Sequence, residues 1–313
     1  MKPVNSRYDI YGLAVECPMT LAAPRSHSRG AADIRLVPVT TRQFDRVRLP
    51  GRHPQTDWFR WSRLADGRTY VRWTDLCEFL ISRDGRLIQY HPFERAPIES
   101  LSVYLLTQVL SFSLLALGIE ALHGSVVQIG DSAAAFVGAC GRGKSTLAAA
   151  MLARGCPLVT DDLVVLRECR GRWLVNTGPR RIKLFPKTAR RVLGKQGQAP
   201  RMNHATTKLV IPLEDLQASR ATVPVGAIYV LDSTSDGHGR SDVKIEDLSG
   251  ARSFLEIVRA SFNLMVTDRA RLEQQFANAR RIAAGVPVRR LGFPRRLELL
   301  PEVCDAVMKN MAN

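Results

Sequence analysis

Clustered cysteines are missing from this sequence. Its six cysteines lie far apart, and no Cys-x-x-Cys pair occurs among them. Structural zinc sites and disulfide-stabilised small domains need such spacing, so we expect neither, and scattered thiols are typical of a reducing cytoplasm. No apolar segment follows the basic N-terminus in the manner of a secretory signal peptide. We therefore expect a cytoplasmic protein.

Acidic residues are scarce relative to basic ones. The chain has 29 Asp and Glu against 45 Lys and Arg, which gives a net charge of +16. This balance favours acidic partners such as nucleotide phosphates or an acidic peptide. The basic residues are spread along the chain, often as Arg-Arg pairs, and form no nucleic-acid recognition motif, so no nucleic-acid partner is expected.

Long uninterrupted apolar runs are also lacking, with one partial exception at residues 101–122. This stretch could span a bilayer by length, but it contains six polar or charged residues, among them Gln108 and Glu120. We interpret it as a buried connecting helix and expect no membrane contact. It would open a second domain, residues 99–313, after a β-rich N-terminal module, residues 1–98.

Alternating apolar stretches separated by turn residues predict strands in the N-terminal module. The clearest hairpin surrounds Asp84-Gly85. The predicted strands are residues 8–15, 34–39, 69–73, 79–81 and 87–90.

One segment of the second domain matches a known phosphate-binding pattern. It reads Gly138-Ala139-Cys140-Gly141-Arg142-Gly143-Lys144-Ser145-Thr146, which fits G-x-x-x-x-G-K-[ST]. In such a loop, backbone N–H groups surround a polyphosphate. Lys144 would reach the β- and γ-phosphates, and the Ser145 hydroxyl would bind Mg²⁺. We expect Cys140 to be a small filler in the loop rather than a nucleophile.

The flanks of this loop agree with the pattern. Residues 133–137 form a short apolar run that predicts a buried strand, and residues 147–153 are rich in Ala and Leu and predict a helix. Gly155 follows where a C-terminal cap belongs. The helix N-terminus would therefore point at bound phosphate.

Three further features are candidates for the chemistry. Asp161 and Asp162 end a short apolar stretch, and we expect them at the end of a strand beside the phosphate strand, where Asp161 would hold Mg²⁺ and the second acid would accept a proton. A turn or a helix cap is the structural alternative. His123 begins another predicted strand, although a lone His is often a packed core residue. Basic residues at 176–186 would clamp phosphate, hold an acidic substrate or form a solvated loop.

The rest of the second domain alternates predicted strands and helices. The expected strands are residues 125–129, 163–166, 173–175, 223–231 and 286–291, and the expected helices are residues 253–284 and 297–311, with a polar loop at 233–241.

Taken together, three motifs resemble the HPr serine kinase family. They are His123-Gly124-Ser125-Val126-Val127, the phosphate loop, and Arg154-Gly155-Cys156-Pro157-Leu158-Val159-Thr160-Asp161-Asp162, in the family's order and spacing. Shorter matches resemble the related kinases of ribosomal peptide pathways, including lasso-peptide precursor kinases. These matches are residues 11–13, 182–186, 224–231 and 286–291.

The resemblance implies an α/β fold with a mixed sheet, similar to phosphoenolpyruvate carboxykinase. It implies ATP and Mg²⁺ as cofactors, with His123, Lys144, Asp161 and Asp162 as catalytic residues and Asp162 as the proton acceptor. A Ser on a peptide or small protein would receive the phosphate, and the family's members form homo-oligomers. The Gly-rich C-terminal signature of the bifunctional HPr kinases is missing, so neither HPr as acceptor nor the reverse reaction is expected.

Other nucleotide-binding classes fit the sequence less well. Leu248-Ser249-Gly250-Ala251-Arg252 resembles a transporter ATPase signature, but no strand ending in Asp-Glu follows it. A nucleic-acid-dependent ATPase would fit the net charge, and a nucleotide-sensing module would need only the loop. The intact Lys144, Ser145 and acid pair favour the kinase.

Overall fold

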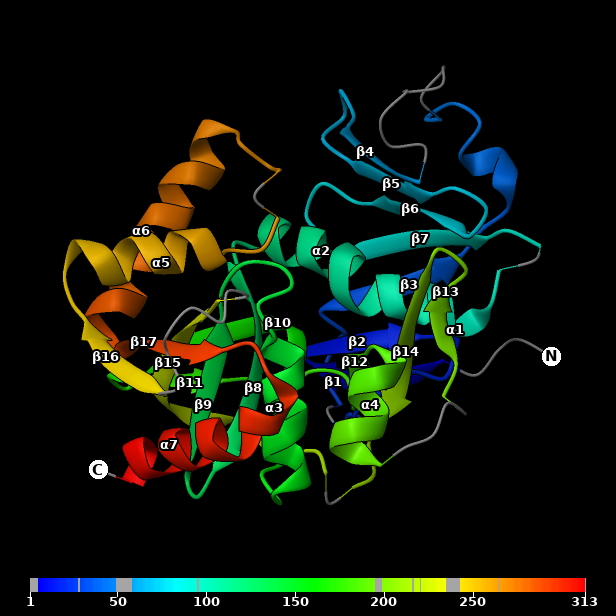
Figure 1. Ribbon diagram of the computed structural model, residues 1–313. Coiled ribbons are helices and arrows are strands. Elements are labelled where there is room, and N and C mark those ends of the chain that lie inside the picture. Colours follow the sequence, from blue (N-terminus) through cyan, green and yellow to red (C-terminus); the bar gives the residue numbers. More distant parts are fainter. Residues whose placement is uncertain are drawn as a thin grey trace. The chain divides into compact units, whose positions relative to one another are not determined.

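The computed structural model describes residues 5–27, 29–48, 58–94, 96–194, 199–215, 217–219, 221–234, 243–263 and 265–312. The chain divides into two compact units (Figure 1). The first contains residues 1–119 and Met202–His204, and the second contains residues 120–201 and 205–313. Most of strand β13 (Arg201–Asn203) therefore belongs to the first unit.

A seven-stranded sheet forms the first unit, in the order β1-β2-β3-β7-β6-β5-β4. Strand β2 pairs in parallel with β3, and β3 pairs in parallel with β7, whereas the other neighbours are antiparallel. The predicted strands and the hairpin at Asp84-Gly85 are present, and β4 was not predicted. The strands are β1 (Ser6–Ile10), β2 (Leu13–Cys17), β3 (Ile34–Pro38), β4 (Phe59–Arg63), β5 (Thr69–Trp73), β6 (Cys77–Ile81) and β7 (Leu87–Pro92).

The long apolar segment differs from its prediction. It forms α1 (Ile98–Tyr104), a π-helical turn η2 (Leu105–Val109) and α2 (Leu110–Ala116), and it groups with the first unit instead of the second. The reason is packing: the Tyr11 hydroxyl donates to the Leu106 carbonyl at 2.9 Å, and the Trp73 ring stacks on Tyr104 at 4.3 Å. Residues 98–116 are long and apolar enough to cross a membrane, but 72% of their most apolar window is buried within the protein.

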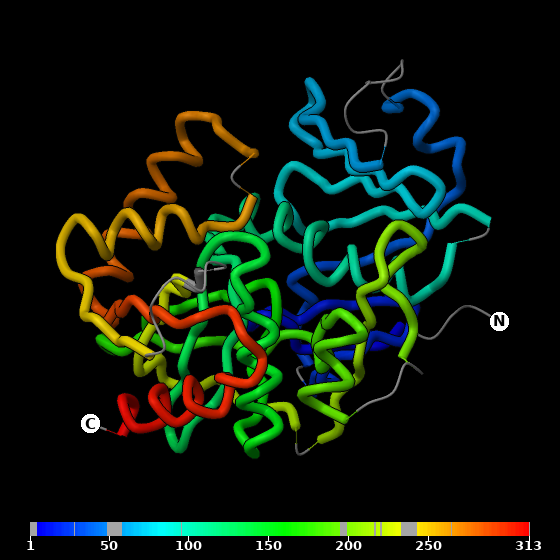
Figure 2. The backbone as a smooth tube through the Cα atoms, viewed as in Figure 1, coloured from blue at the N-terminus to red at the C-terminus, as the bar shows by residue number. Residues whose placement is uncertain are grey.

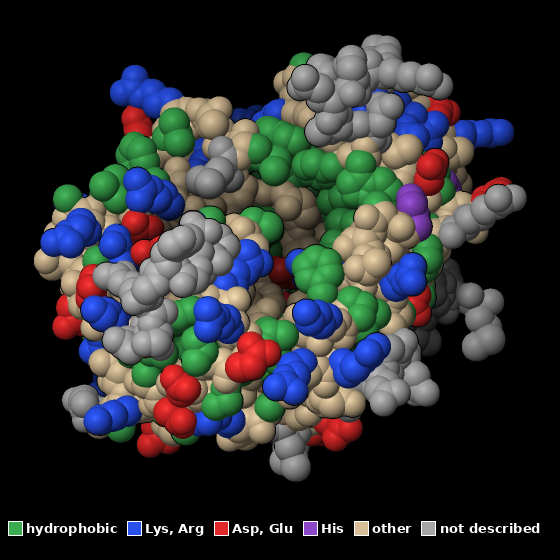
Figure 3. Space-filling view, in the orientation of Figure 1, with side chains coloured by type: hydrophobic (Ala, Val, Ile, Leu, Met, Phe, Trp, Pro, Cys, Tyr) green, Lys and Arg blue, Asp and Glu red, His purple; other side chains and the backbone are tan. Residues whose placement is uncertain are grey.

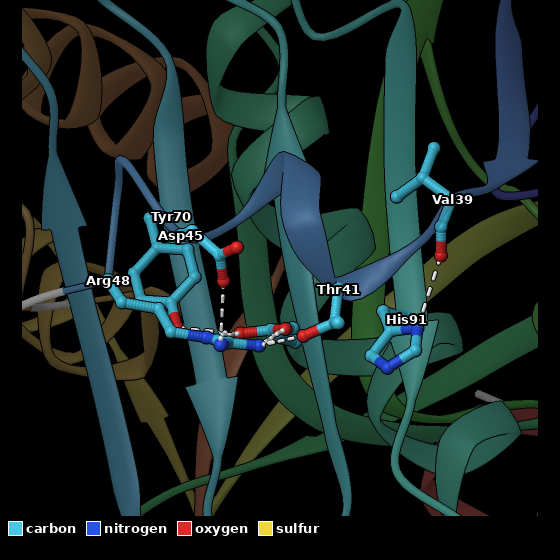
Figure 4. A network of polar contacts seen from close by, with 7 residues as sticks. Val39, Thr41, Asp45, Arg48, Tyr70 and His91 are labelled. Carbon is cyan, nitrogen blue, oxygen red and sulfur yellow. Dashed lines mark hydrogen bonds and ion pairs between the residues drawn. The ribbon is translucent and has the colours of Figure 1, made fainter.

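A buried ion pair joins a short helical turn to the same sheet (Figure 4). The Arg48 side chain, just beyond η1 (Thr41–Gln43), donates from Nε to the fully buried Glu78 carboxylate at 3.1 Å. The Tyr70 hydroxyl donates to the same carboxylate at 3.0 Å. Because all three groups are satisfied together, this buried charge is compensated.

The second unit has a mixed seven-stranded sheet in the order β11-β10-β8-β9-β15-β17-β16. Strands β9, β15 and β17 are parallel, and the remaining neighbours are antiparallel. The expectation of a mixed rather than fully parallel sheet is therefore confirmed. The strands are β8 (Ala121–Ile129), β9 (Ser132–Val137), β10 (Leu158–Cys169), β11 (Arg172–Val175), β15 (Val223–Thr234), β16 (Lys244–Leu248) and β17 (Val288–Pro294).

Helices cover both faces of this sheet (Figure 2). Helices α3 (Lys144–Ala153), α4 (Pro186–Leu193) and α7 (Leu300–Ala312) pack on the face that carries Phe136 and Leu291. Helices α5 (Ala251–Ala260) and α6 (Arg269–Gly285) pack on the opposite face. The turn η3 (Leu297–Leu299) precedes α7, and β12 (Arg181–Leu184) pairs with β14 (Thr206–Pro212).

The single helical stretch predicted over residues 253–284 is two helices. The chain leaves α5 after Ala260, and the Asp268 side chain then caps α6 by accepting from the Arg271 N–H at 3.1 Å. The helical periodicity on both sides hid this break because its polar residues also suit an exposed helix face. Most of the predicted loop at 233–241 lies outside the described residues.

Candidate active site

The glycine-rich loop joins the C-terminal end of β9, the central strand of the sheet, directly to α3. Gly143 precedes the first helical residue with a φ of +94°, in the left-handed region that favours glycine. Lys144 and Ser145 then begin the helix. The first N–H groups of a helix have no partner within it, so this junction is suited to bind an anion.

Lys144 is buried beneath the loop. Its ammonium donates to the carbonyl oxygens of Gly138 at 2.8 Å and Ala139 at 3.1 Å. Burial lowers the pKa of Lys144 from its ordinary value. An ammonium group held by backbone carbonyls is available to a polyphosphate that reaches the same loop.

Asp161 accepts three hydrogen bonds at the centre of the site. The Ser125 and Ser145 hydroxyls donate to its Oδ1 at 2.7 and 2.8 Å, and the Lys183 backbone N–H donates to Oδ2 at 3.1 Å. Burial and the neighbouring Asp162 carboxylate raise the pKa of Asp161. Ser145 and Asp161, the two predicted Mg²⁺ ligands, therefore lie in direct contact, and Ser125 is a further contact for which no role was predicted.

Asp162 forms an ion pair with the Lys183 ammonium. Burial raises the pKa of Asp162, but the charge and hydrogen bond of Lys183, together with the charges of His123 and Arg181, outweigh burial and hold the pKa below its usual range. Asp162 also has a φ of +74°, which is rare for a residue other than glycine and costs on the order of 1–3 kcal/mol. Such strain is often found at functional sites.

The two acids occupy a different place in the sheet from the one predicted. They lie within β10 rather than at its end, because residues 163–165 continue the pairing with β8. The acids were predicted on a strand next to β9, the strand that leads into the glycine-rich loop. Strand β10 is instead separated from β9 by β8. The carboxylates still reach the loop because Asp161 projects onto Ser125 of β8 and Ser145 of α3.

His123 lies on β8, opposite Leu163 of β10. Its ring is 5.5 Å from the Phe262 ring. Burial, together with the Lys144 charge, lowers the pKa of His123 to about 4, so the imidazole is neutral at neutral pH. A Cβ on the next residue, Gly124, would lie 2.7 Å from the Phe136 carbonyl oxygen, which explains the glycine after His123.

A cavity of about 310 Å³ brings many of these side chains together. Of the predicted residues, it contains His123, loop residues 140–146 and Asp162, whereas Gly138 and Ala139 line a separate cavity of about 380 Å³ and Asp161 lines neither. Lys183 of the basic segment 176–186 also lines the first cavity, as do Lys187 and Lys208 beyond it, but Arg180 and Arg181 do not. The complete lining is His123, Cys140, Gly141, Arg142, Gly143, Lys144, Ser145, Thr146, Asp162, Lys183, Leu184, Phe185, Lys187, Thr188, Lys208, Phe293, Arg295, Arg296, Leu297 and Leu300.

Phe185, Phe293 and the Arg295-Arg296 pair had no predicted role in the site. The repeated Arg-Arg pairs were the sequence feature that pointed to part of this set. The rest could not be predicted, because nothing in the local sequence shows that the residues after β17 lie near the loop after β9. Lys and Arg side chains are numerous on the face of the second unit seen in Figure 3.

The residues present suit a magnesium ion bound mainly through a nucleotide. No group of three or more His, Cys, Asp or Glu side chains with metal-binding geometry occurs in the described parts of the chain. Mg²⁺ keeps several waters and takes one or two protein ligands beside substrate phosphates. The Ser145 hydroxyl and Asp161 carboxylate, 2.8 Å apart, fit that limited role.

Comparisons with known proteins find a likeness only among solved structures, and it is distant. No protein-family model matches the chain, and no curated protein matches it. A solved structure of the HPr(Ser) kinase/phosphatase from Coxiella burnetii is similar over 61% of this chain and 96% of that chain, with 15% sequence identity and a TM-score of 0.35. At this identity and TM-score, the similarity does not identify the reaction.

Proposed function

We propose that this chain is an ATP- and Mg²⁺-dependent kinase that transfers the γ-phosphate of ATP to a serine hydroxyl of a peptide or small protein. One observation carries the proposal: the Asp162 carboxylate, which forms an ion pair with Lys183, lines the same cavity as Lys144 and Ser145 of the glycine-rich loop. Phosphoryl transfer to a hydroxyl needs a phosphate cradle and a proton acceptor side by side.

Each residue has a separate role in this proposal. The loop N–H groups and Lys144 bind and orient the β- and γ-phosphates, and Ser145 with Asp161 would hold Mg²⁺, which supplies charge neutralisation when bound. Asp162 takes the proton of the serine hydroxyl while the serine oxygen forms a bond to the γ-phosphorus. The bond from that phosphorus to the bridging oxygen of ADP breaks at the same centre.

Lys183 and His123 act beside this base. The Lys183 ammonium keeps Asp162 ionised and therefore competent to accept a proton. His123 is neutral at neutral pH and lines the same cavity as Asp162. It would support the base as a hydrogen-bonding group near the acceptor oxygen.

The resemblance to kinases of ribosomal peptide pathways makes a precursor peptide the first acceptor to test. A nucleotide-dependent ATPase or sensor that works with nucleic acid or a protein partner remains the alternative. The ion-paired Asp162 favours the kinase, since a sensor needs no buried base next to its phosphate loop.

The experiment measures phosphate transfer by the purified chain from γ-labelled ATP with Mg²⁺ to a library of serine peptides. We expect Asp162→Asn to keep ATP binding and to lose about 10²–10⁴ of the transfer rate, the usual contribution of a general base. Asn also accepts a positive φ more readily than most residues, so the strand should fold. Lys144→Ala should lose turnover.

The control is Asp305→Asn, which removes an exposed carboxylate that pairs with Arg154 outside the cavity. It should transfer phosphate at the wild-type rate. ATP hydrolysis stimulated by DNA or RNA, with no phosphopeptide formed, would contradict the proposal. So would near wild-type transfer by Asp162→Asn.

A further inference from the structure

The cavity contains more Lys and Arg side chains than the proposed reaction requires. Seven Lys and Arg side chains line it against one carboxylate, Asp162. Arg142 and Lys144 belong to the glycine-rich loop, and Lys183 is paired with Asp162. Four cations remain, although Mg²⁺ would already neutralise part of the nucleotide charge. Such an excess of one sign in a cleft attracts a second anionic group.

The four remaining cations come from two places in the fold. Arg295 and Arg296 follow β17, next to the apolar residues Phe293 and Leu297. Lys187 on α4 and Lys208 on β14 lie with Phe185 at the junction of β12 and α4. The Lys208 ammonium is 5.2 Å from the centre of the Phe185 ring.

The second group lies on the side of the proposed base. Lys183, which pairs with Asp162, is the last but one residue of β12, and the chain then continues directly into Phe185 and Lys187 at the start of α4. The charge of Lys208 also contributes to lowering the pKa values of His123 and Lys144, after the larger effect of burial. An acceptor hydroxyl that reaches Asp162 therefore comes close to this junction.

The exposed ring gives this junction the character of a binding surface. The Phe185 residue is 51% exposed, and Lys187 is exposed without an ion pair or side-chain hydrogen bond to any described residue. A large exposed apolar ring next to cations offers packing and charge to a peptide at once.

We propose that Phe185, Lys187 and Lys208 form the acceptor-binding surface and select a serine flanked by acidic side chains. The flanking carboxylates would pair with the two lysines, and a neighbouring apolar side chain would pack on Phe185. This inference rests on the proposed kinase function and adds the substrate class to it.

The test compares serine peptides that differ only in flanking charge, with ATP and Mg²⁺. The wild-type protein should phosphorylate Asp- and Glu-flanked peptides with a kcat/KM roughly tenfold or more above that for neutral peptides. Lys187→Glu with Lys208→Glu should lose this preference between acidic and neutral peptides.

Charge reversal also gives a readout that damage to the fold cannot imitate. The double variant should phosphorylate Lys- and Arg-flanked peptides better than the wild-type protein does. Arg190→Glu is the matched control, because it makes the same change at an exposed position of the same helix α4 that does not line the cavity. It should keep the acidic preference.

Phosphorylation without regard to flanking charge would overturn this inference and leave the kinase proposal standing. A double variant that gains no activity on basic peptides would overturn it as well. No phosphorylation of any serine peptide, with ATP still bound, would instead overturn the kinase proposal and this inference together.

Discussion

At the scale of single residues, the protonation state of Asp162 depends largely on Lys183. Burial raises the pKa of Asp162, and the charge and hydrogen bond of Lys183, with smaller effects of His123 and Arg181, lower it below its usual range. Lys183 also holds Asp161 through its backbone N–H. The same residue of β12 therefore contacts both carboxylates, one through its side chain and the other through its backbone.

Lys183→Met should move the acidic limb of the kcat/KM profile to higher pH. With the ammonium removed, burial raises the pKa of Asp162, so the base is protonated over a wider acidic range. Activity should fall more at pH 6 than at pH 9, while ATP binding at pH 9 is retained. Lys183→Arg keeps a cation and should leave the limb closer to its original position. An unchanged limb in Lys183→Met would contradict this role.

His123 should make the folded state less stable in acid. Its pKa of about 4 in the folded chain lies below the value of about 6.5 expected when unfolded, so between these values only the unfolded chain binds the proton. The contribution of His123 to the free energy of unfolding is therefore complete above about pH 6.5 and is lost as the pH falls from there towards 4.

The measurement is urea unfolding at pH 7 and pH 5. Between these values the wild type should lose up to about 2 kcal/mol more stability than His123→Asn, which cannot titrate. Equal losses in the two proteins would show that the imidazole does not titrate in this way.

At the scale of elements, a buried ion pair connects α6 to Glu120, the first residue of the second unit. Arg271 near the N-terminus of α6 pairs with Glu120 at 3.1 Å, and both side chains are nearly inaccessible to solvent. Arg271 also donates to the Phe262 carbonyl at 3.0 Å, and the Phe262 N–H donates to the Ala121 carbonyl at 2.7 Å. The segment between α5 and α6 is thereby fixed beside His123.

Arg271→Met should destabilise the second unit by about 3–5 kcal/mol, because it leaves the buried Glu120 carboxylate without its cation. Arg269→Met in the same helix is the control. Its exposed pair with Glu273 should contribute less than about 0.5 kcal/mol. Thermal and urea unfolding measure both, and similar losses in the two variants would refute the assignment of a special role to the buried pair.

At the scale of the whole molecule, the net charge of +16 should make acceptor binding sensitive to salt. Mobile ions screen charges separated by more than about 8 Å at physiological ionic strength. The kcat/KM for acid-flanked peptides should therefore fall severalfold between 50 mM and 300 mM NaCl, mainly through KM. Peptides without charge should change little over this range, and an equal response of both would argue against electrostatic attraction.

Local sequence was sufficient for much of the fold and part of the site. The glycines and Lys144-Ser145 predicted a strand, a loop and a helix because each signal lies within a few residues. Alternation in the first unit predicted five of its strand regions, which the structure resolves into six strands, for the same reason. The family resemblance added the mixed sheet and the association of His123 with the acid pair.

Only the tertiary structure decided which distant segments meet. The place of Asp162 inside β10, its pairing with Lys183, and the approach of Phe185 and Arg295 to the glycine-rich loop depend on strand order and register. The same holds for residues 98–116, whose apolar surface suits either unit until Tyr11 and Trp73 pack against them. Sequence by itself determined the chemistry that the loop offers, because backbone conformation there is local. Long-range packing determined which charges surround that chemistry, because the free energy of burying and pairing them exists only in the assembled fold.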